Sequence, residues 1–500
     1  MRQIFSFNEG WKFCREKDAM KNDMRISNFF SMYSKKCKTG VARGLRSSCY
    51  FDADWQDVHL PHDWDAGAEF DLNSITAGFK PNEVVWYRKQ FRIPAEYEGK
   101  HIKMKFDAIA IDSEIYFNNV LVERSFTGYT PITIDITDFV RYGKINTVAV
   151  RVFNGLQEGW WYEGGGIYRN AYIFVEDECR FEDDGVFVSA ERTNGDNWTV
   201  RVRSEVTCDS GDMSGLKVAV TYDGATYTAD AAAVTEQRFS VSNPPLWNVW
   251  NVGEPNLCSV TVKLLRGDEV MDSRDITFGF REVRFDASEG CFFNGKPVKI
   301  AGVCLHDDHA GVGTAIPYKV HLYRMKRLKA MGCNGIRTSH NPYNPEFYRA
   351  CDEVGMVVMD EIRQFCTTRD GLRDLRTFIR RDRNHPCVIL WSMFNEEIHQ
   401  CSREGEKIGR TMKALINEED GTRLVTGGQN GSIEAEGIIH VAVVMGFNYM
   451  QYGYDEFHAT YPDMPIIGSE NASYISGRGE PEFVMEEGHA ASYGKELYKS

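Results

Sequence analysis

Long apolar runs and concentrated positive charge are both missing from this sequence. No run approaches the ~18 apolar residues of a membrane-spanning helix, and residues 1–8 lack the apolar core of a signal peptide. Lys35, Lys36 and Lys38 form the one notable basic cluster, and the formal net charge at pH 7 is −14. Because a polyanion-binding surface needs concentrated positive charge, we expect neither a membrane nor a nucleic-acid partner.

The cysteines also lack a recognisable pattern. There are 13 of them, from Cys14 to Cys401, and none forms a CxxC pair. An odd number without regular spacing favours reduced thiols over a disulfide framework or a zinc site. We therefore predict a cytoplasmic protein.

The overall composition is that of a soluble globular chain, with 42% hydrophobic and 26% charged residues. At 500 residues the chain is too long for one core, which predicts roughly three domains. The aromatic content of 13% suits β-sandwich cores and also sugar sites, where aromatic rings stack on the C–H faces of pyranoses.

Residues 1–177 are predicted to be all-β. Segments 85–93 and 102–106 alternate apolar and polar residues, which is the period of a half-buried strand. Asn118 and Asn119 follow a short apolar segment and predict a hairpin, because asparagine tolerates the left-handed backbone of such a turn. Many strands separated by turns indicate a sandwich or jelly roll.

Two stretches of this first domain combine aromatic and polar residues in an unusual way. One is residues 60–65, and the other is residues 159–169, where three aromatic residues precede three consecutive glycines. Glycine lets the backbone approach another surface closely. A seam between domains explains both stretches, and so does a loop that reaches a sugar site; the two explanations are compatible.

Residues 178–284 form a second β-rich unit. Short predicted strands recur at regular intervals, a rhythm typical of an immunoglobulin-like sandwich; they lie at 186–188, 200–202, 218–222 and 260–264. The unit lacks the Cys…Trp…Cys pattern of antibody domains and carries no evident chemistry, so we expect a spacer.

From residue 285 onward, strands alternate with helical patterns such as 321–330, which predicts a parallel α/β barrel over residues 285–500. Seven strands are recognisable, at 298–303, 333–336, 355–359, around Leu390, 423–426, 441–445 and 465–470. No strand-like apolar run follows Glu470, so we expect a barrel that is incomplete at its C-terminal end. The first and seventh strands would present an incompletely paired edge, which favours association with other chains, a homo-oligomer included.

Two of these strands end in carboxylates. The apolar strand around Leu390, typical of a strand buried on both faces, ends in Asn395, Glu396 and Glu397, and the last predicted strand ends in Glu470. The 74 positions between Glu396 and Glu470 correspond to about three strand–helix units, which places these acids on strands four and seven. Active sites of such barrels lie at the carboxyl ends of the strands. Paired acids there are the minimal equipment for glycoside hydrolysis, and two unrelated solvated loop acids are the alternative.

Five motifs occur along the chain: residues 61–64 (PHDW), 166–169 (GIYR), 335–342 (GIRTSHNP), 384–396 (from NHP to NE) and 466–470 (IIGSE). As a set they resemble glycoside hydrolase family 2, the family of β-galactosidases, β-glucuronidases and β-mannosidases, and bacterial β-galactosidases most of all. The resemblance extends over essentially the whole chain. It implies a jelly-roll sugar-binding domain, an immunoglobulin-like domain and a catalytic (β/α)8 TIM barrel, without the C-terminal end of the barrel or any later domain.

The resemblance also implies that Glu470 is the nucleophile and Glu396 the acid/base of a retaining enzyme. Glu397 is expected to face away from the sugar, because neighbouring side chains on an extended strand point in opposite directions. The implied substrate-binding residues are His306, Arg337, His340, Asn395 and Tyr449. Among these, Asn395 would bind the sugar 2-hydroxyl and Tyr449 would donate to the nucleophile, whereas a purely structural role is the alternative for the two histidines.

The sequence departs from the family pattern at two places. Residues 363–367 offer no Glu and His for the magnesium ion that certain β-galactosidases bind there, so we expect no metal and no cofactor. The Asn-x-Lys signature of β-glucuronidases is absent from residues 472–500. From the resemblance to bacterial β-galactosidases we predict an exo-acting β-galactosidase. The alternatives are a β-glucuronidase or β-mannosidase of the same family, an inactive carbohydrate-binding fragment, and a lectin-like module that uses the jelly roll alone.

Overall fold

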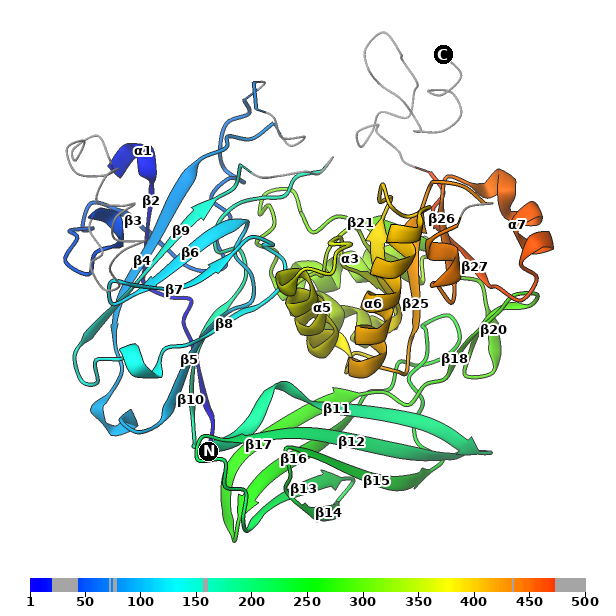
Figure 1. Ribbon diagram of the computed structural model, residues 1–500, viewed down its shortest axis with the longest axis horizontal. Helices are drawn as coiled ribbons and strands as arrows, with labels where there is room; N and C mark the ends of the chain where they lie inside the picture. Colours follow the sequence, from blue (N-terminus) through cyan, green and yellow to red (C-terminus); the bar gives the residue numbers. More distant parts are fainter. Residues whose placement is uncertain (20–43, 72, 75–78, 156–160, 434–435, 473–500) are drawn as a thin grey trace.

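Two β-sandwiches and a parallel α/β barrel make up the computed structural model, which describes residues 1–19, 44–71, 73–74, 79–155, 161–433 and 436–472 (Figure 1). The chain passes from the jelly roll (blue and cyan) through the immunoglobulin-like sandwich (green) into the barrel (green to orange-red). The predicted fold class is confirmed. None of the described helices is long and apolar enough to cross a membrane.

The jelly roll consists of two antiparallel sheets. One has the order β1 (Gln3–Ser6), β10 (Ala171–Glu176), β5 (His101–Phe106), β8 (Ile132–Asp135). The other has the order β3 (Gln56–Val58), β2 (Trp11–Arg15), β4 (Val84–Arg92), β9 (Ile145–Phe153), β6 (Asp112–Phe117), β7 (Val120–Ser125). The short helical segments are α1 (Glu16–Ala19), η2 (Gly44–Arg46), η3 (Ala95–Tyr97) and η4 (Thr137–Phe139).

The sequence patterns of the jelly roll explain these strands. Every second residue of β5 is buried, because alternate side chains of a strand point to opposite faces of its sheet. The predicted hairpin is confirmed between β6 and β7, where Asn118 and Asn119 have φ values of 46° and 74°.

The immunoglobulin-like unit is also a two-sheet sandwich. One sheet has the order β11 (Cys179–Asn194), β12 (Asn197–Cys208), β15 (Val234–Ser242). The other has the order β14 (Ala225–Asp230), β13 (Leu216–Tyr222), β16 (Cys258–Arg266), β17 (Glu269–Phe278). Trp198, Val200 and Val262 are among the buried residues that fill the core of this sandwich.

One disulfide corrects the expectation that all cysteines are reduced. Cys179 and Cys208 lie opposite each other in the antiparallel register of β11 and β12, and their sulfurs are bonded. The sequence could not reveal the pair, because 29 positions separate the two residues and only the strand register brings them together. The argument from reduced thiols to a cytoplasmic location therefore loses its support.

Two predicted barrel strands need new boundaries. The first was predicted at 298–303, but Val298 ends β20 (Lys296–Val298) of a small antiparallel sheet with β18 (Val283–Asp286) and β19 (Gly290–Phe293), and the barrel begins with β21 (Gly302–Leu305). The sixth was predicted at 441–445 but runs later, as β26 (Met445–Asn448). Its apolar run instead follows the turn η5 (Ile438–His440) and packs into the barrel core, which apolar periodicity alone cannot distinguish from a strand.

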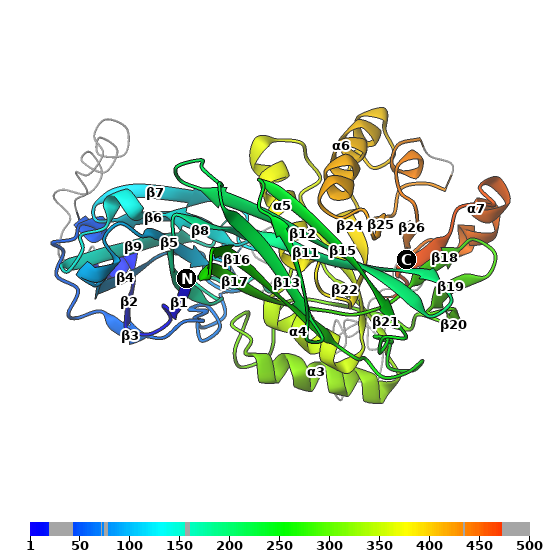
Figure 2. The ribbon, with the colours of Figure 1, turned by 90° about the horizontal axis from the view of Figure 1, so that it is seen from below.

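The barrel sheet contains seven parallel strands in sequential order within the described residues, as predicted. After β21 come β22 (Gly335–Thr338), β23 (Val357–Glu361), β24 (Val388–Asn395), β25 (Leu424–Gln429), β26 and β27 (Ile466–Glu470). The helices between them are α3 (Tyr318–Met331), α4 (Pro345–Val354), α5 (Arg369–Asp382), α6 (Arg403–Glu419) and α7 (Tyr454–Thr460), with η6 (Gln451–Gly453) before the last. Figure 2 shows α3 and α4 on one side of the strands and α5 and α6 on the other.

Strand β24 is the centre of this sheet. All eight of its residues are buried, since β23 and β25 flank it and the helices cover it. At the two ends of the sheet, no ladder joins β21 to β27 in the described part of the chain, which confirms the incompletely paired edge. The thiol of Cys304 in β21 nevertheless lies 3.2 Å from the Ser469 carbonyl oxygen of β27, so the barrel is nearly closed.

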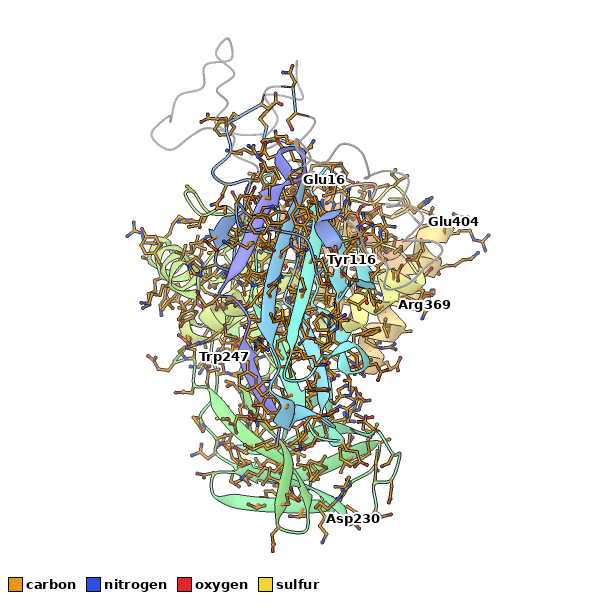
Figure 3. The ribbon with its side chains drawn as sticks, turned by 90° about the vertical axis from the view of Figure 1, so that its left-hand side faces the viewer. Glu16, Tyr116, Asp230, Trp247, Arg369 and Glu404 are labelled. Atoms are coloured by element: carbon orange, nitrogen blue, oxygen red, sulfur yellow. A yellow bond between two sulfur atoms is a disulfide. The ribbon has the colours of Figure 1, made fainter. Side chains whose placement is uncertain are left out.

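Polar contacts fix the immunoglobulin-like unit to the base of the barrel. Trp247, labelled in Figure 3, donates from its indole nitrogen to the Asp352 carbonyl at 2.9 Å. Asn384, just before β24, accepts from the Val188 backbone N–H and donates to the Val186 carbonyl, both at 2.9 Å. This asparagine thus continues the hydrogen bonding of β11 across the domain boundary.

Candidate active site

Side chains from five of the seven barrel strands, β22, β23, β24, β26 and β27, meet at the carboxyl end of the sheet. Arg337 of β22 is the centre of this group. Its Nη2 lies 2.7 Å from Glu361 Oε2 of β23 and 2.8 Å from Asn395 Oδ1 of β24, and its Nη1 lies 2.6 Å from Glu470 Oε1 of β27. One buried guanidinium therefore holds three strand ends in a single arrangement.

Glu361 is a site residue that the sequence prediction missed. It is completely buried and also accepts from His340 Nδ1 at 2.7 Å and from the Ser392 hydroxyl at 2.6 Å. Burial opposes its ionisation, but Arg337 and the hydrogen bonds from His340 and Ser392 outweigh burial and lower the pKa of Glu361. A carboxylate at the end of the third predicted strand was the signal that could have identified it.

The ion pair that lowers the pKa of Glu361 raises the pKa of Arg337. Burial favours its neutral form, but the nearby carboxylates of Glu361 and Glu470 outweigh this effect and raise the pKa of Arg337. The guanidinium is therefore a permanent positive charge beside Glu470.

Glu396 has a different kind of partner. The Asn448 amide donates to Glu396 Oε1 at 2.9 Å and to Asn395 Oδ1 at 2.9 Å, and the Ser469 hydroxyl donates to Asn448 Oδ1 at 2.6 Å. The buried Asn448, which the sequence prediction did not single out, thus joins β24 to β27 without adding charge.

The backbone conformation at the end of β24 affects the directions of the Glu396 and Glu397 side chains. Strand β24 ends at Asn395, and Glu396 has a φ of 50°, in the left-handed region that is costly for a residue with a side chain. Its N–H donates to the Gly428 carbonyl at 2.8 Å. The expectation for Glu397 assumed an extended strand, and that premise is wrong, because the chain turns at Glu396.

A backbone hydrogen bond places Tyr449 next to Glu470. Its φ is 57°, and its N–H donates to the Glu470 carbonyl at 2.7 Å. Two residues in the left-handed region, Glu396 and Tyr449, therefore flank the candidate site, a pattern common where backbone strain serves function. The hydrogen bond expected from the Tyr449 hydroxyl stays a prediction.

A loop of the jelly roll reaches this site. The Trp161 ring stacks on His306 with centroids 4.7 Å apart and meets the edge of His340 at 5.2 Å. Burial, together with the positive charge that His340 can carry, lowers the pKa of His306 to about 4, so this imidazole is neutral at pH 7. The two histidines thus lie together against Trp161, and their role in sugar binding stays a prediction.

The same loop also forms a seam with the barrel. The buried Asp63 accepts from the Tyr162 hydroxyl at 2.8 Å and from the Thr314 backbone N–H at 2.8 Å. A Cβ atom on Gly164 would collide with the Thr314 side chain, which explains the glycine. The seam between domains is confirmed for the described part, residues 161–169, and the loop reaching a sugar site stays a prediction.

Within the described residues, no group of three or more His, Cys, Asp or Glu side chains is arranged to hold a metal ion. Carboxylates and amides that converge at the mouth of a parallel barrel, with a sandwich loop beside them, are the arrangement expected of a multidomain glycosidase.

Comparison with known families identifies the chain more closely. The profile "Glycosyl hydrolases family 2, TIM barrel domain" matches residues 287–369 and 366–479, the sugar binding domain of that family matches residues 65–179, and a third profile, "Glycosyl hydrolases family 2", matches residues 175–281. The chain belongs to glycoside hydrolase family 2.

Its relatives have names of two kinds. A β-galactosidase of Bacteroides ovatus is 30% identical over 86% of this chain and 57% of its own length. A putative β-glucuronidase of Formosa agariphila is 31% identical over 75% of this chain and 37% of its own length. The crystal structure of a family 2 member from Bacteroides cellulosilyticus has a TM-score of 0.81 at 32% identity and covers 95% of this chain and 64% of that one. The chain therefore spans only part of the length of each relative.

Proposed function

We propose that this chain carries the catalytic site of a retaining exo-β-glycosidase that hydrolyses terminal β-D-galactosides. Glu470 is the nucleophile and Glu396 is the acid/base. Asn395 and His340 bind the sugar, Trp161 and His306 form the wall beside it, and Arg337 positions Glu470 and Asn395.

The observation that carries these roles is the contrast between the partners of the two acids. Arg337 Nη1 lies 2.6 Å from Glu470, and its positive charge stabilises the carboxylate that a nucleophile requires. Glu396 receives an uncharged amide N–H from Asn448 at 2.9 Å, which is compatible with carrying a proton in one step and losing it in the next. Two carboxyl groups in different environments are the usual basis for dividing such roles.

The reaction then proceeds by two displacements. The Glu470 carboxylate attacks the anomeric carbon while Glu396 gives its proton to the departing glycosidic oxygen, which leaves a glycosyl-enzyme ester. Glu396 next takes a proton from water, whose oxygen attacks the same carbon and releases Glu470. Two inversions at one carbon retain the configuration.

The choice of galactosides is supported by the β-galactosidase of Bacteroides ovatus, which aligns with 86% of this chain. The putative β-glucuronidase, at 31% identity, makes β-glucuronides the second candidate. A metal-free and cofactor-free site, a homo-oligomer and a cytoplasmic location stay predictions.

A panel of aryl β-glycosides tests this function. We expect the wild-type chain to hydrolyse the galactoside, and we expect Glu470→Gln to be inactive. Glu404→Gln is the control, because Glu404 is an exposed acid in the first turn of α6 (Figure 3). Turnover of the glucuronide alone would contradict the substrate assignment. Sugar binding without any turnover would favour the inactive carbohydrate-binding alternative.

A further inference from the structure

A third carboxylate, Glu361, lies behind the two proposed catalytic acids. It is the last residue of β23 and is completely buried, so it cannot touch a sugar in the pocket. Burial opposes its ionisation, but Arg337 and the hydrogen-bond donors around it outweigh burial and lower the pKa of Glu361, which is therefore a carboxylate at neutral pH. A buried charge is costly to keep, so the reason for this one lies in the groups that it holds.

The first of these groups is the Arg337 guanidinium. Glu361 Oε2 lies 2.9 Å from Arg337 Nε and 2.7 Å from Nη2, and Oε1 lies 3.0 Å from Nη2. Such a fork-like pair fixes the plane of the guanidinium as well as its position. The remaining contacts of Arg337 go to Glu470 Oε1 at 2.6 Å and to Asn395 Oδ1 at 2.8 Å. Glu361 therefore directs Arg337 toward both of these residues.

The second group is the His340 imidazole. Its Nδ1 lies 2.7 Å from Glu361 Oε1, and because a carboxylate can only accept, Nδ1 is the donor. This contact turns the other ring nitrogen, Nε2, toward Glu470 Oε1 at 3.7 Å. Glu361, Arg337, Glu470 and His340 thus form a closed ring, in which each side chain contacts the next. The Ser392 hydroxyl supports this ring from β24 by donating to Glu361 Oε2 at 2.6 Å.

The ring also divides the positive charge that Glu470 receives. The titratable side chains around Glu470 are those of Arg337, His340, His306 and Cys304, with Tyr449 and Glu396 beyond them. Desolvation lowers the pKa of His306 and raises the pKa of the Cys304 thiol, so both are uncharged at pH 7. Arg337 is consequently the permanent cation beside Glu470.

An unshared cation would slow the proposed attack. Glu470 loses its negative charge as it forms the ester bond, so a full positive charge beside it stabilises the ground state more than the transition state. Glu361 lies on the other side of the same guanidinium and offsets part of this charge.

We propose that Glu361 is a positioning residue of the reaction: it orients Arg337 and His340 against Glu470 and shares the charge of Arg337, so that Glu470 stays ionised but free to attack. This inference rests on the proposed function, because Glu470 is the proposed nucleophile. Glu361 acts through its two partners and has no contact of its own with the sugar.

Two substitutions separate the charge of Glu361 from its shape. Glu361→Gln removes the charge and one acceptor oxygen, and we expect it to slow formation of the glycosyl-enzyme from a 2-fluoro aryl galactoside about a hundredfold. The acid limb of its kcat/KM profile should move to lower pH, because the charge of Arg337 then acts on Glu470 alone. Glu361→Asp keeps the charge and should slow the same step about tenfold while the acid limb stays in place.

The control is Asp360→Asn, the preceding residue on the opposite face of β23. The Tyr348 and Thr338 hydroxyls lie 2.7 Å and 3.1 Å from Asp360 Oδ1. Burial, together with the charge of Asp382, raises the pKa of Asp360 well above its ordinary value, so asparagine resembles its neutral form. We expect this variant to react within about twofold of the wild-type rate.

Ser392→Ala is a milder variant that decides the matter if Glu361→Gln fails to fold. It keeps every charge and removes one donor to Glu361, so it should slow glycosyl-enzyme formation about threefold relative to Asp360→Asn. A Ser392→Ala rate equal to that of Asp360→Asn would contradict the positioning role. So would a Glu361→Gln rate close to the wild-type rate, or the same acid limb for Glu361→Gln and Glu361→Asp.

If the wild-type chain forms no glycosyl-enzyme, the proposed function fails instead. Crystal structures of the wild-type chain and of Glu361→Gln then test the positioning role without turnover. A glutamine side chain has one acceptor oxygen, so its amide N–H would face an N–H of either Arg337 or His340. Displacement of either side chain from Glu470 supports the proposal, and two unmoved side chains overturn it.

Discussion

At the scale of residues, the site depends on a division between charged and neutral partners. Arg337 joins Glu361, Asn395 and Glu470, whereas the amide of Asn448 serves Glu396. A positive charge beside Glu470 and an uncharged donor beside Glu396 give these two identical side chains different surroundings. The proposed division of their roles rests on this difference. Removing Glu470 and removing Glu396 should therefore reduce turnover to different extents.

Glu470→Gln is expected to abolish turnover of every substrate, because no nucleophile remains. Glu396→Gln should retain slow turnover of aryl glycosides with good leaving groups, since such groups depart without a proton. Steady-state kinetics on a series of aryl glycosides of decreasing leaving-group pKa measures this difference. Equal losses for both variants on the most activated substrate would contradict the assignment of roles.

His306 predicts a pH dependence of stability. Its pKa is lowered from the ordinary value of 6.5 to about 4 in the folded chain, chiefly by burial. Between pH 4 and pH 6.5, the His306 side chain therefore binds more protons in the unfolded chain than in the folded chain. His306 accordingly contributes stability above pH 6.5, and this contribution is lost as the pH falls toward 4.

Urea unfolding at several pH values checks this prediction. His306→Gln should lose less stability than the wild-type chain between pH 6.5 and pH 4, the two pKa values of His306. The exposed His399, changed to Gln, is the control. Parallel curves for His306→Gln and the wild-type chain would contradict the burial argument.

At the scale of elements, the barrel sheet has a protected centre and two exposed ends. Strand β24 has a ladder on both sides and is fully buried, whereas β27 has a ladder only with β26 among the described residues, and only Ser469 of its five residues is buried. Local opening is easiest where few contacts hold the backbone. The two proposed catalytic acids thus lie at the ends of strands that are stabilised to different extents.

Hydrogen exchange should reveal this inequality. We expect the amides of Ile466 and Ile467 in β27 to exchange faster than those of Ile389 and Leu390 in β24 under native conditions. The comparison is internal, because both pairs are apolar residues of the same sheet. Equal protection would mean that β27 is stabilised by more than its ladder with β26.

At the scale of the whole molecule, the barrel is held by both sandwiches. Arg169 of the jelly roll lies 2.9 Å from Asp307 and donates to the Pro342 carbonyl at 2.8 Å. On the other side, the Asn384 side chain bonds to the backbone at Val186 and Val188 of β11. Each contact leaves buried polar groups unpaired if one partner is removed.

Asn384→Ala is accordingly expected to destabilise the chain by about 2 kcal/mol, because two backbone groups of β11 lose their partner. The Val188 amide, which donates to Asn384 Oδ1, should exchange faster in the variant. Urea unfolding and hydrogen exchange measure the two effects. Asn417→Ala, an exposed position on α6, is the control, and a variant as stable as this control would contradict the docking role.

Local sequence alone determined the type and order of the structural units. Alternation with period two predicted strands such as β5, and an unbroken apolar run ending in acids predicted β24 and the position of Glu396. These features follow from short-range periodicity, which is why they can be recognised without a structure. The run at 441–445 was misplaced because a buried loop and a buried strand have the same apolar signal, whereas the run at 298–303 joins the end of β20 to the start of β21.

Tertiary structure decided which side chains meet. The contacts of Arg337 with Glu361 and Glu470 span 24 and 133 positions, and the Cys179–Cys208 bond spans 29. Trp161 reaches His306 from another domain, and Asn448 reaches Glu396 from another strand. Such contacts depend on strand register, barrel curvature and domain docking. These are set by the packing of the whole chain, because no local pattern records which distant surfaces will bury one another.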